Sequence, residues 1–234
     1  MKLDHVVYFT NKSPEEVVKE KKDEGKHVVE GGRHEKWGTH NALLYVKNAY
    51  VEWLSVEHMD IAENVDHPLT RLLLHDVKYG DGWGTLCLSI EGIERFRDEI
   101  ENKGFRTSGV IDAERKTTSG ELKRWKMLFV EQPVSGELPF PFFIEWEESE
   151  EERLAKLREQ GILTAENENL AIHECVFAVE DPLKETGEWA VLLSQKVGDD
   201  HNIVLENVRL KFVQAEGDLK RERLQEVVIG AAVE

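Results

Sequence analysis

The sequence predicts an α+β fold made of repeated βαβββ units, two of them full and a third one partial. The order strand, helix, strand, strand, strand returns along the chain, and such an internal repeat constrains the fold before any motif is considered. The last strands of the first two units also look alike, with YVEW at residues 50–53 and FIEW at 143–146. The repeat divides the chain into predicted units at 1–78, 79–160 and 161–234.

The first unit begins with residues 2–10, an alternating run rich in Val, Tyr and Phe that predicts a strand. Ser13 then supplies an N-cap, and Pro14 occupies the first helical position. The predicted helix continues to about Glu24 and stops at Gly25. Three strand-like runs complete the unit, at residues 27–29, 39–46 and 49–56.

The second unit repeats this order. Its helix, residues 94–103, has apolar side chains at helical spacing and ends at Gly104. The polar and charged stretch 113–120 predicts a hairpin. Strands are predicted at residues 85–90, 105–111, 124–131 and 142–146.

The third unit follows an acidic helix around residues 148–160. His173 opens its first strand nine positions before Pro182, the same spacing that separates His5 from Pro14. This agreement predicts that the strand-to-helix geometry of the first unit is reused. The remaining elements are a strand at 173–179, a helix to about 195, and strands at 202–214 and 224–231.

Composition narrows the classes of partner. The 234 residues carry 47 acidic and 30 basic side chains, for a net charge of −17. A field of that sign repels phosphate backbones, so nucleic acid is not an expected partner, and acidic membrane surfaces are disfavoured for the same reason. The sequence is otherwise that of an ordinary globular protein with a strongly solvated surface.

Cysteine usage and the N-terminus predict a cytoplasmic protein. The two cysteines, Cys87 and Cys175, lie far apart inside apolar runs, which indicates buried thiols in a reducing compartment. Asp4 and His5 interrupt the first apolar run, so it lacks the continuous apolar stretch of a signal peptide. No run approaches the roughly 18 apolar residues typical of a membrane span.

Several motifs together resemble the glyoxalase-like domain family, a branch of the vicinal oxygen chelate superfamily. They are LDHVVYF at 3–9, GGRH at 31–34, GTHN at 38–41, YVE at 50–52 and PFPFFIEW at 139–146. The resemblance covers roughly residues 2–150. It implies that the two full units form an open, eight-stranded, barrel-like cleft that takes a small-molecule ligand.

The resemblance also implies a metal site built from the first and last strands of each unit. At the matching positions the chain has His5, Glu52 and Glu145. An imidazole and two carboxylates suit one divalent metal such as Zn, Ni, Mn or Fe, which would chelate adjacent substrate oxygens. The fourth position falls near Thr85 or Cys87, where metalloenzymes of the superfamily usually have His or Gln. A metal-free cleft therefore stays open as the alternative.

Glu52 and Glu145 are also predicted catalytic residues, since a glutamate ligand can leave the metal and move a proton. Each carboxylate follows an aliphatic residue and precedes a tryptophan, so it points to the face opposite those neighbours. That face is either solvent or the cleft, and the equivalence of the two glutamates favours the cleft. His5 has a simpler alternative, a hydrogen bond to a backbone carbonyl.

A polar cluster at residues 31–41 predicts part of the ligand pocket. Arg33 could clamp a substrate carboxylate, and His40 could act as acid or base. The alternative is that the glycines form a tight bend that Asn41 caps. Arg124 is either a second anion contact or a solvated edge charge. The predicted substrate-binding residues are Arg33, His34, Asn41, Arg124 and Trp146.

Two further histidines are expected to be structural. His67 precedes Pro68 at the start of a linking helix and is predicted to lie in the cap region. His173 repeats the position of His5, but no complete neighbouring unit would give it a partner site.

Three functions are compatible with these residues. The first is a small-molecule lyase, isomerase or dioxygenase-like enzyme, and the second is a metal-free protein that binds or sequesters a small ligand on the same scaffold. In the third, the pocket is vestigial and the C-terminal unit mediates assembly through a long apolar edge at residues 202–214, which would allow a homodimer. The sequence has no Gly-x-Ser-x-Gly elbow, P-loop or Rossmann glycine motif.

Overall fold

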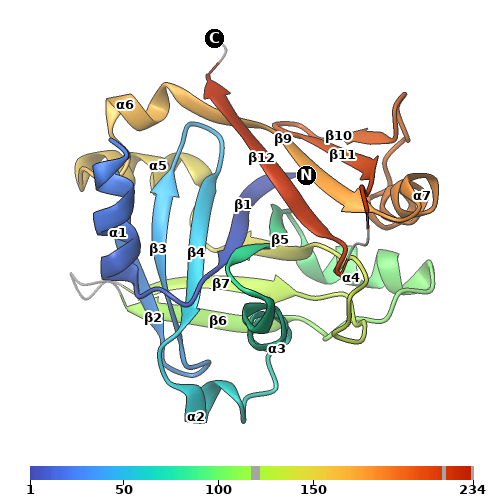
Figure 1. The fold of residues 1–234 in the computed structure, drawn as a ribbon, viewed down its shortest axis with the longest axis horizontal. Coiled ribbons are helices and arrows are strands. Elements are labelled where there is room, and N and C mark those ends of the chain that lie inside the picture. The colour runs from blue at the N-terminus through green and yellow to red at the C-terminus, as the bar shows by residue number, and fades with distance from the viewer. Residues whose placement is uncertain (117–121, 218–219, 233–234) are drawn as a thin grey trace.

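Two β-sheets carry the fold in the computed structural model, which describes residues 1–116, 122–217 and 220–232 (Figure 1). The first sheet has eight strands and curls into a half-barrel, and the second has four. The predicted α+β class with repeated βαβββ units around an open barrel is confirmed. The first four-strand set consists of β1 (Lys2–Phe9), α1 (Pro14–Asp23), β2 (Val29–His34), β3 (Thr39–Tyr45) and β4 (Tyr50–Val56).

Short helices link this set to the second one. The linking elements are α2 (Met59–Ala62), α3 (Pro68–Asp76) and the 3-10 turn η1 (Val77–Tyr79). The second set consists of β5 (Gly82–Ser89), α4 (Ile93–Asn102), β6 (Ile111–Lys116), β7 (Leu122–Leu128) and β8 (Phe142–Trp146).

The strand order shows how the two sets are related. It reads β2-β3-β4-β1-β5-β8-β7-β6, so β1 and β5 are neighbours at the centre. Strand β1 pairs in parallel with β4, and β5 pairs in parallel with β8, while β1 and β5 run antiparallel. Each set therefore presents its first and last strands at the middle of the sheet.

The helix starts follow the sequence signals. Ser13 accepts a hydrogen bond from the backbone of Glu16, whose side chain bonds back to Ser13, and Pro14 takes the first helical position. Helix α5 (Glu150–Glu159) begins with the same reciprocal arrangement between Ser149 and Glu152. These caps satisfy backbone donors that a helix leaves without partners.

The strand predicted at 105–111 is shifted toward the C-terminus. Apart from an isolated bridge between Thr107 and Val130, the pairing begins at Ile111, where β6 joins β7. The polar stretch predicted as a hairpin begins in β6, which pairs antiparallel with β7 at the edge of the sheet, where side chains can stay solvated. The rest of the predicted hairpin, residues 117–120, lies outside the described residues.

The second sheet has the order β10-β11-β9-β12. Strand β9 pairs in parallel with β11 and antiparallel with β12, as β1 pairs with β4 and β5. His173 on β9 bonds the carbonyl oxygen of Ala231 at 3.0 Å, which is a structural role. The remaining elements are α6 (Ala165–Glu168), β9 (Leu170–Val179), α7 (Pro182–Leu193), β10 (Asn202–Val204), β11 (Arg209–Gln214) and β12 (Arg223–Ala231).

The continuous strand expected at 202–214 is wrong, because the chain turns between β10 and β11. Leu205 N–H donates to the Val208 carbonyl in this turn. The Asn207 side chain reaches across to the first sheet, where it accepts from Leu3 N–H at 2.7 Å and donates to the Asn48 carbonyl at 2.8 Å. The edge strand β10 has only three residues, so the long apolar edge proposed for assembly is not found in the described part of the chain.

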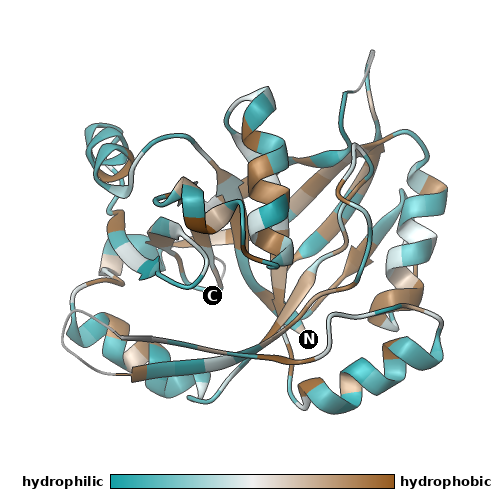
Figure 2. Ribbon diagram, turned by 90° about the horizontal axis from the view of Figure 1, so that it is seen from below, coloured by the Kyte–Doolittle hydropathy of each residue, from teal (hydrophilic) through white to brown (hydrophobic). Residues whose placement is uncertain are grey.

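Apolar cores lie on both faces of the large sheet. One core packs α1, α4 and the second sheet against its outer face, and it contains Phe143, Phe177 and Trp189. The other core packs α3 into the concave face. Figure 2 shows mixed hydrophobic and hydrophilic segments on the helices and mostly hydrophobic residues on the central strands. No helix of the described residues is long and apolar enough to cross a membrane.

Candidate functional site

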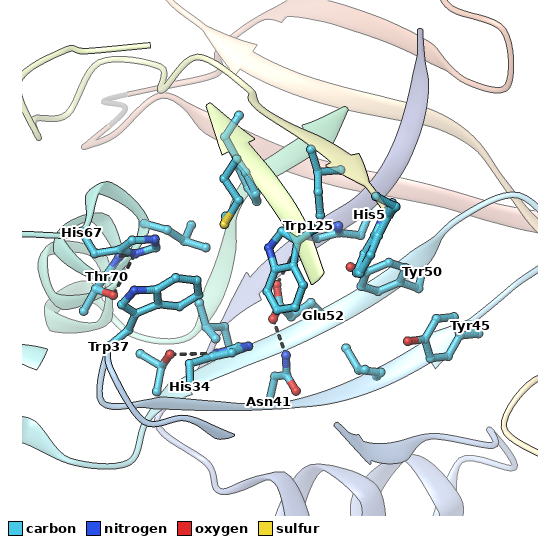
Figure 3. A pocket seen from close by; sticks show the side chains of 18 residues that line it. His5, His34, Trp37, Asn41, Tyr45, Tyr50, Glu52, His67, Thr70 and Trp125 are labelled. Carbon is cyan, nitrogen blue, oxygen red and sulfur yellow. Dashed lines mark hydrogen bonds and ion pairs between the residues drawn. The ribbon is translucent and has the colours of Figure 1, made fainter. Parts of the chain in front are cut away.

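A cavity opens on the concave face of the eight-stranded sheet (Figure 3). The empty space of the cavity, including its open mouth, measures about 660 Å³. Strands as distant in the sheet as β3 and β7 both contribute, which requires the sheet to curl around it. The lining consists of His5, His34, Trp37, Thr39, Asn41, Leu43, Tyr45, Tyr50, Glu52, Leu54, His67, Leu69, Thr70, Trp125, Met127, Phe142, Ile144 and Trp146.

A buried Asp4–His5 pair lies at one end of the cavity. The pairing of β1 with β5 shifts register between Leu3 and His5, a bulge that lets two consecutive side chains meet. The Asp4 carboxylate oxygen Oδ1 lies 2.8 Å from His5 Nδ1. Its other oxygen accepts hydrogen bonds from Trp146 Nε1 at 2.9 Å and from the Arg153 guanidinium at 3.2 Å. Asp4 therefore holds two side chains that line the cavity, His5 and Trp146.

Asp4 is held ionised by these partners. Burial by itself would raise the pKa of Asp4, but Arg153, His5 and Trp146 together hold it well below its usual range. An ionised carboxylate can only accept, so Asp4 retains the proton of His5 on Nδ1. The second ring nitrogen, Nε2, is then directed away from Asp4 and toward Glu52.

Glu52 is fixed from two sides. His5 Nε2 lies 3.5 Å from one carboxylate oxygen, and Asn41 donates its side-chain N–H to the other. The Asn41 carbonyl oxygen in turn accepts from the backbone N–H of Gly32 at 2.8 Å. A Cβ on Gly31 would lie 1.9 Å from that oxygen, so only glycine fits there. The GGRH motif thus orients Asn41, and Asn41 orients Glu52.

Aromatic rings surround this polar group. Tyr50 stacks on the His5 ring at 4.4 Å, and Phe142 meets it edge-on at 5.5 Å. Burial, followed by the charges of Asp4 and Glu52, raises the pKa of Tyr50 well above its ordinary value, so Tyr50 stays a neutral phenol. Trp125 and Trp146 pack against each other at 5.4 Å on the opposite wall.

Glu145 does not reach the cavity. Its carboxylate accepts hydrogen bonds from the backbone N–H groups of Gly92 at 2.5 Å and Ile93 at 3.3 Å. It therefore caps the N-terminus of α4, where Gly92 provides no side-chain cap. The sequence-based alignment of residues 50–53 with 143–146 is offset by one residue, and a one-residue offset moves a strand side chain to the other face.

The strand register gives the correct correspondence. His5 and Glu52 belong to a parallel pair in which His5 faces Tyr50. In the second set, Cys87 faces Phe142 in the same way, so Cys87 corresponds to His5. Glu52 lies two residues after Tyr50 on β4, and Ile144 lies two residues after Phe142 on β8, so Ile144 corresponds to Glu52. The second set thus places a thiol and an aliphatic side chain where the first has an imidazole and a carboxylate.

Other predicted residues divide between the cavity and the surface. His34 lines the cavity and bonds Thr39, whereas His40 points to the opposite face of β3 and does not line it. Burial lowers the pKa of His40 there. Arg33 is 69% exposed and pairs with Glu57. Arg124 is 55% exposed and pairs with Glu114 and Glu147, so neither arginine contributes to the cavity.

Sequence reasoning missed several residues that contribute to the site. Asp4 was not predicted, because regular strand alternation places it on the face opposite His5. The bulge that overrides this alternation has no sequence signal. His67 caps α3 as predicted, but it also lines the cavity. Its position could not be foreseen, since α3 packs into the concave face only in the tertiary structure.

One group of described residues could hold a metal ion, namely Asp4, His5 and Cys87, whose ligand atoms lie within 4.8 Å of one another. Its chemistry does not fit. Both Asp4 oxygens already bind protein donors. Cys87 is fully buried, and burial, followed by the charges of Asp4 and Glu52, raises its pKa well above the usual value, which disfavours the thiolate that binds metals. At the position that corresponds to Glu52, the second set has Ile144 and not a carboxylate.

Comparison with known proteins agrees with this architecture. A model of the glyoxalase-like domain matches residues 3–193. A hypothetical protein from Staphylococcus aureus superimposes with a TM-score of 0.81 at 21% identity, over 99% of this chain and 91% of its own. That match includes the second sheet and shows a shared fold.

More distant structures cover only part of the chain. A methylmalonyl-CoA epimerase from Streptomyces coelicolor, in complex with 2-nitronate-propionyl-CoA, gives a TM-score of 0.45 at 15% identity, over 63% of this chain and 99% of its own. The epimerase from Mycobacterium tuberculosis gives 0.41 at 18% identity, over 66% and 91%. No curated protein matches the chain. With its paired four-strand sets, its concave cavity and a domain match over residues 3–193, the chain belongs to the glyoxalase-like domain family.

Proposed function

We propose that this protein is a small-molecule enzyme of the isomerase or lyase type that works by proton transfer at His5 and Glu52. The observation that carries the proposal is the buried array in which Asp4 orients His5, His5 faces Glu52 at 3.5 Å, and Asn41 holds Glu52. Oriented acid and base groups at the end of an aromatic cavity are typical of enzymes that remove a proton from carbon.

The reaction would begin at a carbon next to a carbonyl group. The C–H bond breaks, and the proton moves to Glu52 or to His5 Nε2. The electron pair shifts onto the carbonyl oxygen and forms an enolate. Returning the proton to a neighbouring carbon or oxygen completes an isomerisation, whereas expelling a leaving group from the adjacent carbon completes an elimination. Asp4 stays ionised throughout and stabilises a protonated His5.

The cavity walls would bind the unreactive part of the substrate. Tyr50, Trp125, Phe142 and Trp146 present ring faces and edges that suit a planar or apolar body. Walls of this kind also exclude water from the reacting end, which strengthens the electrostatic interactions there. The proposed substrate is therefore a small carbonyl compound with an apolar ring or chain.

A metal-free binding protein is the second candidate. It is favoured by the fact that both oxygens of Glu52 and both ring nitrogens of His5 already face partners within the protein. In that case the array would only hold the cavity open for a ligand. Substrate chelation by a Zn, Ni, Mn or Fe ion is less well supported, because the second strand set lacks the matching donors.

Solvent exchange provides the test. Protein treated with a chelator is incubated in D₂O with simple ketones, and NMR follows the loss of the proton next to the carbonyl. We expect exchange to fall by about 10²- to 10⁴-fold in His5→Gln and in Glu52→Gln. His40→Gln and Glu145→Gln are matched controls that should exchange at the wild-type rate.

Other outcomes of the exchange assay would support one of the alternative functions. Saturable binding without exchange, in wild type and variants alike, would favour the binding protein. Exchange that needs added metal would restore the chelation hypothesis, together with a rise in melting temperature on metal addition. The homodimer remains a prediction that sedimentation equilibrium can test.

A further inference from the structure

We infer that His67 donates a hydrogen bond to an acceptor oxygen on the ligand, at the end of the cavity away from His5, and that the ligand is uncharged. This inference rests on the proposed small-molecule site and adds a second point of recognition to it. In Figure 3 His67 and Trp37 lie at one end of the cavity, His5 and Tyr50 lie at the other, and Glu52 and Trp125 lie between them.

The hydrogen bonds of His67 determine its tautomer. His67 is the N-cap residue of α3, and its Nδ1 accepts the backbone N–H of Thr70 at 3.4 Å. A neutral imidazole that accepts at one nitrogen carries its proton on the other. His67 therefore presents Nε2–H as a donor. Its Nδ1 also lies 3.2 Å from the Thr70 hydroxyl, which can donate to the same lone pair.

That donor is buried without a partner. His67 is only 3% exposed, and Nε2 has no hydrogen-bond partner among the described residues. A buried polar group without a partner destabilises the folded state, and such groups in native proteins call for an explanation. Because His67 lines the cavity, an acceptor atom on a bound molecule would satisfy the donor.

The ring is held neutral and in one orientation. Burial, with a smaller effect from Arg71, lowers the pKa of His67 to about 3, so the ring stays uncharged near neutral pH. Trp37 stacks on it at 4.1 Å with an interplanar angle of 16°, and Phe129 meets its edge at 5.3 Å. These contacts prevent the ring from turning Nε2 toward another partner.

The charges around the cavity indicate the class of ligand. Glu52 is the one carboxylate in the lining described above, and that lining includes no Lys or Arg side chain. The nearby Arg153 guanidinium is engaged by Asp4 and stacks on the Trp146 ring at 4.7 Å. A phosphate or carboxylate in the cavity would find no cation and would be repelled by Glu52. A carbonyl or ether oxygen suits the His67 donor better.

A matched pair of probes tests the inference. Acetophenone and ethylbenzene have similar shape, but only the ketone has an acceptor oxygen. Their dissociation constants are measured by calorimetry or by quenching of the cavity tryptophans in wild type, His67→Phe and the control His40→Phe. For each protein, the dissociation constant of acetophenone is divided by that of ethylbenzene. Comparing this ratio between a variant and wild type cancels the difference in hydration of the two probes, as in a double-mutant cycle.

We expect His67→Phe to weaken the binding of acetophenone, relative to that of ethylbenzene, by about tenfold. His40→Phe should leave the ratio of the two dissociation constants unchanged. An unchanged ratio in His67→Phe, with both probes still binding, would overturn the role of His67 and leave the proposed site intact. Absence of saturable binding of either probe to wild type would overturn both. Tighter binding of benzoate than of acetophenone would overturn the uncharged class of ligand.

A measurement on the wild-type protein tests the inference even if the His67→Phe variant folds poorly. Long-range ¹H–¹⁵N NMR of the histidine rings should show His67 as the neutral Nε2–H tautomer at pH 7. Saturating acetophenone should move the Nε2–H proton downfield, and ethylbenzene should not. An Nδ1–H tautomer, or no difference between the two probes, would contradict the inference.

Discussion

The two halves of the eight-stranded sheet share one strand pattern but differ in what they bring to the cavity. The first half, β1–β4, supplies His5, Asn41 and Glu52. The second half, β5–β8, has Cys87 and Ile144 at the positions that correspond to His5 and Glu52. One half thus supplies ionisable side chains to the cavity, and the other supplies a hydrophobic wall.

This difference separates fold from chemistry. A repeat in the backbone guarantees that equivalent side chains converge on the same cavity, but it does not guarantee that they are the same side chains. A four-ligand metal site needs donors from both halves, whereas a proton-transfer site needs only one. Under the proposed function, the asymmetry favours acid–base chemistry, and the cavity-lining Trp125, Phe142 and Trp146 would bind the substrate according to its shape.

The largest expected effect comes from substituting equivalent positions in the two halves. Glu52→Gln should lower ketone exchange by about 10²- to 10⁴-fold, because it removes a proton acceptor without changing shape. Ile144→Val should change probe affinity by only a few-fold and leave the exchange rate at saturation unchanged. Similar losses of rate in both variants would show that the halves are not functionally distinct.

Adding metal-binding donors to the second half tests the same difference from the opposite direction. Cys87→His combined with Ile144→Glu would place imidazole and carboxylate groups opposite His5 and Glu52. We expect zinc at a thousandfold excess over its dissociation constant to stabilise this double variant by about 4 kcal/mol, measured as a rise in melting temperature. Wild type should show no such rise. An equal response in both proteins would mean that the wild-type donors already suffice.

Acid stability should report on His67, which lies on the segment joining the two halves. Its folded-state pKa of about 3 is below the unfolded value of 6.5, so its contribution is complete above pH 6.5 and is lost as the pH falls toward 3. Between these two pH values, the contribution of His67 to the free energy of unfolding should fall by about 1.4 kcal/mol per pH unit. The free energy of unfolding of His67→Phe should therefore depend less steeply on pH in this window. Parallel curves for wild type and variant would contradict the buried, neutral state.

The smallest effect is expected at Glu145. Glu145→Gln should cost about 1 kcal/mol of stability, because it weakens the interaction with the N-terminus of α4. The exchange rate should not change, since the side chain lies on the face opposite the cavity. Chemical denaturation and the exchange assay measure the two quantities separately, and a loss of rate would return Glu145 to the site.

Much of the fold could be predicted because its signals are local. The N-caps, the prolines at helix starts and the strand periodicity identify the βαβββ order without knowledge of distant contacts. His5 and Glu52 were assigned to one cleft through the family resemblance, and they lie close together because the first and last strands of the unit pair side by side. A tight bend at Gly31 and Gly32 was one of the two interpretations of this segment. The close approach of Gly31 to the side-chain oxygen of Asn41 was not predicted.

The amino-acid sequence is sufficient to predict the order of the elements, the repeat, and the polar residues that the first half brings to the cavity. Three features depend on long-range packing, namely the face on which Glu145 lies, the contact of Asp4 with His5, and the position of His67 in the cavity wall. Each of these depends on a register, a bulge or a packed helix. Such features follow from which strands and helices meet, and a shift of one residue reverses the direction of a side chain.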